Sequence, residues 1–220
     1  MRAMILAAGK GSRLKEITND TPKPLVKVAG KPVIERTLSQ LAVLGIKEII
    51  INVWYLGDQL IDAIGNGERF GVTIKWSREE RLMNTGGGVR QALSLLGDAP
   101  FLAVNGDILW DLDLAPILDH FDSQRMDALL GLIPNPDGFK GDFTLTSSGA
   151  LERTAGAFTY SGIQILSPSA LQPFPIEPFS LNSFYDKALL TKRLHGSVLD
   201  GRWTDMGTPQ RLEMAHREWV

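Results

Sequence analysis

A glycine-containing loop early in the sequence has the composition of a phosphate-binding segment. Gly9 and Gly11 follow the apolar run Ala3–Leu6 and are separated by one lysine. Two glycines at this spacing let the backbone turn sharply and point amide N–H groups at an anion. The small side chains of Ala7 and Ala8 leave room for a flat base or a ribose. The pattern favours phosphate binding over its alternative, a plain strand-to-loop turn.

This loop matches neither of two common nucleotide-binding patterns. Leu14 stands where the dinucleotide fingerprint requires a small residue, and no Gly-Lys-Ser/Thr sequence ends the loop as in a Walker motif. The second expected strand ends Ile51-Asn52-Val53, without the acidic residue that binds ribose in dinucleotide-dependent enzymes. An oxidoreductase of that class is therefore disfavoured.

A lysine between two prolines provides a candidate cation for the same loop. Pro22 and Pro24 fix their own backbone angles and restrict the residue before each of them, so Lys23 is rigidly mounted. A point charge held in this way suits contact with a phosphate. The alternative is an ordinary turn with a solvated lysine. We expect an exposed side chain whose replacement by alanine leaves the melting temperature nearly unchanged.

Three consecutive glycines precede an expected helix in a third segment. Gly86, Gly87 and Gly88 follow Thr85, in a loop at the carboxyl end of an expected parallel strand. Such a flexible sequence is costly to order, so it indicates close approach by a ligand or by another backbone segment. Open α/β sheets bind ligands at this edge.

Two aspartates are candidates for holding a metal ion. Asp107 follows Asn105-Gly106 after a buried strand, and Asp205 lies in what we expect to be a tight glycine-containing turn. Asp107 is equally compatible with a metal ligand and with a turn or helix cap. Magnesium in nucleotide sites is held by one or two carboxylates together with phosphates and waters. The two aspartates could form such a pair if the fold brings them together.

The elements that must position these residues alternate between two periodicities. Short, nearly continuously apolar runs predict buried strands at 3–6, 48–53, 72–76 and 101–104, and residues 32–44, 56–64 and 88–96 show helical spacing. This alternation predicts an α/β fold, with a mixed, mostly parallel sheet and helices on both faces. Beyond Asp107 the strand-like pieces 128–133, 143–146 and 158–166 look antiparallel and lid-like. Helices are expected near 114–121, at 180–190 and at 208–218.

Composition excludes several classes of protein. The 220 residues contain 23 Lys and Arg against 25 Asp and Glu, a balance that argues against nucleic-acid or membrane-surface binding. The absence of cysteine excludes disulfides, thiolate nucleophiles and zinc-thiolate sites. The longest uncharged stretch, 154–176, is interrupted by three prolines and is not expected to span a membrane. We expect a soluble, cytoplasmic protein.

Taken together, the five motifs resemble those of the sugar-1-phosphate nucleotidyltransferase family. The motifs are 6–14, 22–25, 85–87, 105–107 and 203–208, and their order and spacing match over nearly the whole chain. The resemblance implies a Rossmann-like fold with a small antiparallel sugar-binding lobe. It also implies transfer from a nucleoside triphosphate to a sugar 1-phosphate with Mg²⁺, releasing pyrophosphate. It further implies one domain over 1–220, with a nucleotide part at about 1–110 plus the C-terminal segment and the lobe at about 125–200.

The resemblance assigns a role to each candidate residue. Arg13 and Lys23 would be catalytic, and Asp107 and Asp205 would hold magnesium. The nucleotide-binding set would be Leu6, Ala8, Gly9, Gly11, Ser12, Arg13, Lys23, Thr85, Gly86 and Asn105. Asp142, Gly162 and Asn182 would bind the sugar.

Within that family, the chain is most similar to the uridylyltransferases that act on N-acetylmuramate 1-phosphate in cell-wall recycling. Its length, the Thr-Gly-Gly-Gly loop with Glu79 ahead of it, and Gly141-Asp142-Phe143 carry this similarity. Hexose-specific relatives usually have a Glu-Lys-Pro segment and a glutamine in the base loop, and neither occurs here. The alternatives are a mannose- or other hexose-1-phosphate enzyme and, from a different class, a non-catalytic sensor of nucleotide sugars. The default expectation is a monomer. For the lactyl carboxylate of a muramate, Lys140 and Arg153 are the candidate partners.

Overall fold

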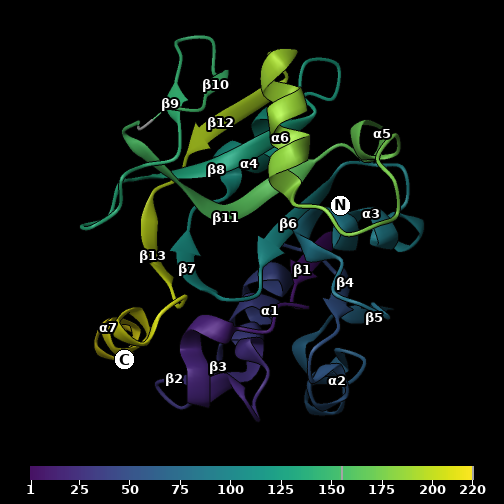
Figure 1. The fold of residues 1–220 in the computed structure, drawn as a ribbon, viewed down its shortest axis with the longest axis vertical. Coiled ribbons are helices and arrows are strands. Elements are labelled where there is room, and N and C mark those ends of the chain that lie inside the picture. The colour runs from purple at the N-terminus through teal and green to yellow at the C-terminus, as the bar shows by residue number, and fades with distance from the viewer. Residues whose placement is uncertain (155, 220) are drawn as a thin grey trace.

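One twisted sheet of seven strands runs through the molecule (Figure 1). The computed structural model describes residues 1–154 and 156–219. The strand order across the sheet is β12-β8-β11-β6-β1-β4-β5. The bounds are β1 Ala3–Leu6, β4 Glu48–Val53, β5 Thr73–Arg78, β6 Phe101–Asn105, β8 Ala128–Pro134, β11 Phe158–Leu166 and β12 Leu194–Val198.

Most neighbouring strands of this sheet are parallel. β6, β1, β4 and β5 form a parallel half, and β12 runs parallel to β8. β11 is antiparallel to both of its neighbours, β6 and β8, and so joins the two halves. The expected mixed, mostly parallel sheet is confirmed. The strands after Asp107 extend the main sheet, and the separate antiparallel pieces are small.

Three two-stranded sheets accompany the main one. β2 (Lys27–Val28) pairs with β3 (Lys31–Pro32), β7 (Ile108–Leu112) with β13 (Gly201–Asp205), and β9 (Thr144–Leu145) with β10 (Leu151–Glu152). The expectation of a tight turn around Asp205 was wrong, because Asp205 is the last residue of β13, which pairs along its length with β7. The sequence analysis had not predicted β7, β12 or β13.

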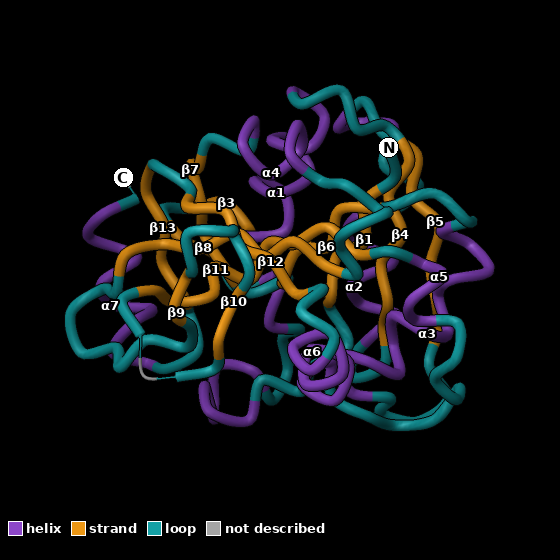
Figure 2. The backbone as a smooth tube through the Cα atoms, turned by 90° about the horizontal axis from the view of Figure 1, so that it is seen from above, coloured by secondary structure: helices purple, strands orange, loops and turns teal. Residues whose placement is uncertain are grey.

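Helices cover both faces of the sheet (Figure 2). The α-helices are α1 Val33–Val43, α2 Gly57–Ile64, α3 Asn84–Leu96, α4 Ala115–His120, α5 Pro168–Leu171, α6 Leu181–Leu190 and α7 Pro209–Glu218, and the 3₁₀ turns are η1 Ser12–Thr18, η2 Lys23–Leu25 and η3 Glu68–Phe70. Side chains of α1, α2 and α4 belong to one core cluster, and those of α3, α5 and α6 to the other.

The continuous apolar runs follow from this two-sided cover. Successive side chains of a strand point to opposite faces. In β1, Ile5 therefore packs into the cluster under α1, whereas Met4 packs into the cluster under α3, and both are fully buried. Because neither face is solvated, a polar residue at either position would lose its hydrogen bonds to water.

A third, smaller cluster attaches α7 to the first loop. Leu14 is 1% exposed and packs in a cluster with Met206 and Leu212. Thr208 caps α7, because its side chain accepts a hydrogen bond from the Arg211 N–H. Leu14 thus serves as the anchor that holds the glycine loop against the C-terminal helix, which explains a bulky residue at this position.

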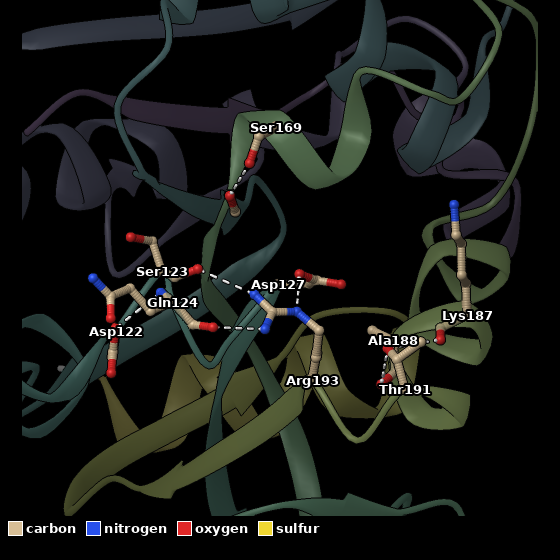
Figure 3. Close-up of polar contacts among 10 residues, drawn as sticks. Asp122, Ser123, Gln124, Asp127, Ser169, Lys187, Ala188, Thr191 and Arg193 are labelled. Atoms are coloured by element: carbon tan, nitrogen blue, oxygen red, sulfur yellow. Dashed lines mark hydrogen bonds and ion pairs between the residues drawn. The ribbon is translucent and has the colours of Figure 1, made fainter.

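An arginine fixes the crossover from α6 into β12. Arg193 donates from Nε to Asp127 Oδ1 at 2.6 Å and from its two terminal nitrogens to the carbonyl oxygens of Gln124 and Ser123 (Figure 3). The Asp127 N–H donates in return to the Arg193 carbonyl. These bonds align the start of β12 with the start of β8.

No helix among the described residues is long and apolar enough to cross a membrane.

Candidate active site

A cavity of about 510 Å³ opens at the carboxyl ends of β1, β4 and β6. Its lining is Leu6, Ala7, Ala8, Gly9, Lys23, Pro24, Asn52, Leu82, Asn84, Thr85, Asn105, Gly106, Asp107 and Ser180. Seven of the sequence-predicted site residues are in this lining: Leu6, Ala8, Gly9, Lys23, Thr85, Asn105 and Asp107. Segments far apart in the chain thus meet at the edge where open α/β sheets bind ligands.

Lys23 and Asp107 form an ion pair in the cavity wall. The turn that carries Lys23 is closed by hydrogen bonds from Leu25 N to Pro22 O and from Val26 N to Lys23 O. Lys23 is only 8% exposed, so the expectation of a solvated side chain was wrong. The cause is Asp107, which supplies the opposite charge that makes burial of an ammonium group tolerable.

The second predicted metal ligand lies next to the first. Asp205 is in register with Ile108, and the Met206 N–H donates to the Asp107 carbonyl at 3.1 Å. The Asp205 carboxylate accepts a hydrogen bond from Gly207 N through Oδ1 and pairs through Oδ2 with Arg211 at 2.6 Å. The pairing of β7 with β13 therefore brings the two aspartates together.

Arg13 completes this group of charges. A methyl group added at Gly207 would lie 2.7 Å from Asp205 Oδ1 and 3.4 Å from Arg13 Nη1, so both side chains flank the same glycine. Arg13 follows Gly11, whose φ of 68° lies in the left-handed region that favours glycine. Gly11 and Ser12 begin the 3₁₀ turn beside the cavity and are outside its lining.

The two aspartates suit a hard divalent cation whose remaining ligands come from a substrate. Within 1–154 and 156–219, no cluster of three or more His, Cys, Asp or Glu residues has a metal-binding arrangement. Mg²⁺ commonly takes one or two carboxylates and fills its other positions with phosphate oxygens and waters. Asp107 and Asp205 fit that pattern.

The model of the family described as Nucleotidyl transferase matches residues 2–143. The chain belongs to this family. N-acetylmuramate alpha-1-phosphate uridylyltransferase of Neisseria meningitidis is 39% identical over 98% of this chain and 96% of the relative. The protein of the same name from Caulobacter vibrioides is 34% identical over 94% of this chain and 92% of the relative. The chain is accordingly a sugar-1-phosphate nucleotidyltransferase, an enzyme.

A solved structure supports the fold. HddC from Yersinia pseudotuberculosis superimposes with a TM-score of 0.84 at 24% identity, over 100% of this chain and 99% of that one. This likeness covers the strands after Asp107 as well as the parallel half. The fold of the nucleotidyltransferase is therefore that of its structural neighbour over the whole described length.

A buried polar chain that the sequence analysis had not predicted supports one wall of the nucleotidyltransferase cavity. Asn52, 2% exposed, accepts from Ala7 N through Oδ1 at 2.8 Å and donates through Nδ2 to Glu79 Oε1 at 2.7 Å. Glu79 Oε2 accepts from Met83 N at 2.9 Å. These hydrogen bonds thus join the carboxyl ends of β1, β4 and β5. The available sequence signals were an amide within the apolar part of β4 and a carboxylate directly after β5.

The Glu79 carboxyl should make stability depend on pH. Burial raises its pKa above the ordinary value of 4.5. A raised pKa gives a stabilising contribution that is fully present below the unfolded-state pKa and is lost as pH rises through the folded-state pKa. Glu79→Gln cannot ionise, so its melting temperature relative to wild type should be higher at about pH 7.5 than at about pH 4.5. Thermal melts at both values measure this, with the exposed neighbour variant Glu80→Gln as control. Equal pH dependence in both variants would contradict the prediction.

The three glycines are required by close approach of the polypeptide. They lie inside α3, which begins at Asn84, so the expected helix start at Gly88 was four residues late. The N–H groups of Gly86 and Gly87 donate to the Phe179 carbonyl at 2.9 and 3.1 Å. Gly88 faces Glu79 and Asn52. Thr85 lines the cavity and Gly86 does not, and the contact of Gly86 with a base stays a prediction.

Adding one methyl group at Gly87 should destabilise the nucleotidyltransferase. A Cβ there would lie 2.3 Å from the Glu177 carbonyl oxygen, a backbone atom that cannot swing away. We expect Gly87→Ala to lower the free energy of unfolding by about 1–3 kcal/mol. Urea unfolding measures this against Gly9→Ala, where no atom lies within 4 Å of the added Cβ. An unfolding midpoint equal to that of the control would contradict the prediction, because it would mean that the backbone around Glu177 moves to accommodate the added methyl group.

The predicted sugar-binding residues lie outside the cavity lining. Gly162, with φ of 84°, lies beside the lining, because a Cβ there would be 2.9 Å from Asn105 Nδ2. Asp142 is exposed and accepts from Tyr160 N at 2.9 Å, and Asn182 is an exposed residue in the first turn of α6. Arg153 pairs with Asp186 at 3.1 Å. Their contact with a sugar stays a prediction.

Proposed function

We propose that the chain transfers a uridylyl group from UTP to N-acetylmuramate 1-phosphate, giving the UDP-sugar and pyrophosphate. Two relatives named for this reaction, 39% and 34% identical over nearly their whole lengths, support the choice of substrates. The observation that carries the chemistry is the Lys23–Asp107 pair in the cavity wall, with Asp205 adjacent.

The reaction requires positioning and charge neutralisation more than covalent help from the protein. A phosphate oxygen of the sugar 1-phosphate forms the new bond to the α-phosphorus, and the bond from that phosphorus to pyrophosphate breaks. The attacking oxygen is ionised at neutral pH, so no general base is required. Lys23 would contact the α-phosphate and the sugar phosphate, and Arg13 with Gly11 and Ser12 would hold the β- and γ-phosphates.

Asp107 and Asp205 would hold Mg²⁺. When bound, the ion would supply charge neutralisation and a template for the phosphates of both substrates. The ion pairs of Asp107 with Lys23 and of Asp205 with Arg211 orient the two carboxylates. In our proposal, the arriving phosphates take over Lys23 as their partner.

The cavity would hold the nucleoside. Leu6, Ala8 and Thr85 line it, and with Gly86 they would form the base slot, while Asn105 would reach the ribose or the sugar. Asp142, Gly162 and Asn182 would contact the sugar. A cytoplasmic, monomeric enzyme of cell-wall sugar recycling is the setting that we propose, with small-molecule substrates and no nucleic-acid or membrane partner.

The test is pyrophosphate release in the presence of magnesium. UTP, dTTP, GTP and CTP are crossed with the 1-phosphates of N-acetylmuramate, glucose, mannose and N-acetylglucosamine. Release only with UTP and the muramate phosphate is the expected result. Release with a hexose phosphate would support the proposed reaction and refute the proposed sugar substrate. No pyrophosphate release in any combination would favour a non-catalytic sensor of nucleotide sugars.

A further inference from the structure

Arg211 occupies a junction between the predicted metal ligand and a loop from the other side of the site. It lies in the first turn of α7, where its N–H bonds to the capping Thr208 at 3.3 Å. Its Nη1 donates to Asp205 Oδ2 at 2.6 Å, and the two side chains are 31% and 23% exposed. This pair is therefore partly shielded from water, which strengthens it relative to a surface pair.

The other face of the same guanidinium group covers an aromatic ring. Arg211 Cζ lies 4.2 Å from the centroid of the Phe139 ring, a cation–π contact. Phe139 in turn packs edge-on against Trp203, with centroids 5.8 Å apart at 72°. Trp203 Nε1 donates to the Ser161 carbonyl at 2.6 Å, next to Gly162. A continuous set of contacts thus runs from Asp205 to the residue before the predicted sugar contact.

Phe139 belongs to a loop, residues 135–142, that follows β8 and carries Asp142 at its end. The base of the loop is fixed by bonds from Asn135 N to Ala157 O at 3.2 Å and from Tyr160 N to Asp142 Oδ2 at 2.9 Å. At the tip of the loop, Phe139 N donates a hydrogen bond to Pro136 O within the loop itself. Among the described residues, the tip is otherwise held by the contacts of Phe139 with Arg211 and Trp203. No residue of this loop lines the nucleoside cavity.

We propose that Arg211 is a positioning residue that ties the loop 135–142 to Asp205. The Arg211 guanidinium group orients the Asp205 carboxylate and at the same time packs against the Phe139 ring. It would therefore fix the position of the proposed sugar-binding loop relative to the proposed metal ligand. The inference rests on the proposed function. It predicts that removing the Phe139 ring from this link weakens affinity for the sugar 1-phosphate and leaves affinity for UTP unaffected.

The test compares Arg211→Met, Phe139→Leu, the double variant and Phe139→Tyr by steady-state kinetics. Loss of the contact should raise KM for the sugar 1-phosphate about tenfold in each single variant, because a shielded cation–π or ion-pair contact is worth about one factor of ten. In Phe139→Leu, KM for UTP should change less than about twofold, since no loop residue lines the cavity. Arg211→Met should also lower kcat, because Asp205 loses its partner. Phe139→Tyr keeps the ring and should behave as wild type.

Non-additivity and hydrogen exchange distinguish a shared link from separate structural damage. The double variant should raise KM for the sugar 1-phosphate no further than the worse single variant. In the unliganded protein, amide exchange of residues 135–142 should accelerate in Arg211→Met and Phe139→Leu. It should not change in Arg217→Met, a control on the same helix whose exposed partner is Glu213.

Several results would overturn the proposal. Additive effects, equal rises of both KM values in Phe139→Leu, or a Phe139→Tyr variant as impaired as Phe139→Leu would each do so. If Arg211→Met melts below the assay temperature, Arg211→Lys replaces it, since a point charge keeps the ion pair and loses the planar stacking. If the wild-type protein releases no pyrophosphate with any sugar phosphate, the proposed function is refuted. Amide hydrogen exchange of residues 135–142 would still decide whether Arg211 and Phe139 hold the loop.

Discussion

Replacing Lys23 by alanine should lower kcat for pyrophosphate release by about 10³-fold, the effect of removing one preorganised charge from a transition state. Lys23 lines the cavity and is held in the Pro22–Pro24 turn, so little freedom must be lost when phosphates arrive. Lys27→Ala is the matched control, because Lys27 is an exposed lysine only four residues away. Activity of Lys23→Ala within about threefold of that control would refute the catalytic role.

The same substitution should also lower the melting temperature. The sequence alone indicated an exposed lysine and no thermal effect. The structure buries Lys23 to 8% exposure against Asp107, so the alanine variant leaves a partly buried carboxylate without its partner. A differential scanning measurement of both lysine variants separates the two expectations. An unchanged melting temperature would mean that Asp107 is solvated well enough to need no partner.

Asp205→Asn should lower kcat/KM by about 10³-fold in magnesium, because one of two charged ligands for the proposed ion is lost. Binding of Mn²⁺ in the presence of UTP, followed by electron paramagnetic resonance, should weaken at least about tenfold. Asp107→Asn should have the same effect on metal binding. A metal titration unchanged in either variant would remove that residue from the proposed site.

The two asparagine variants should differ in stability. Asp107→Asn leaves the nearly buried Lys23 ammonium without its ion-pair partner. Asp205→Asn does the same to Arg211, but the Arg211 side chain is 31% exposed and still contacts the Phe139 ring. The melting temperature should therefore fall further in Asp107→Asn. Asp111→Asn is the control for both, because Asp111 lies in the same two-stranded β7–β13 sheet and pairs with Arg202 at the surface.

Local sequence was sufficient for the parts of the fold that depend on periodicity. The run at 3–6 is apolar without interruption and the run at 48–53 is nearly so, because both faces of these strands are covered, and a buried parallel strand has that signature. The helix over 32–44 was predicted from its apolar spacing, and α1 is Val33–Val43. The motifs 6–14 and 105–107 begin at the last residues of β1 and β6, which is why Asp107 could be placed just after a buried strand.

The remainder depends on contacts between distant residues. Burial of Lys23 requires Asp107, 84 residues further on, and Glu79 is held by Asn52, 27 residues earlier. β13 has a single aromatic residue, Trp203, among glycine and polar residues, and its strand form depends on pairing with β7. Arg211 was not predicted, because a single arginine in a polar helix turn is unremarkable until Asp205 and Phe139 are seen on its two sides.

β11 imposes a constraint on how the enzyme can move. It is hydrogen-bonded to β6 on one edge and to β8 on the other, so the parallel half of the sheet and the β8–β12 pair share a backbone ladder. A hinge between rigid bodies would have to break that ladder. Access to the reacting phosphates must therefore be regulated by connections at the rim while the scaffold beneath stays still. Substrate capture of this kind involves small displacements and fast opening.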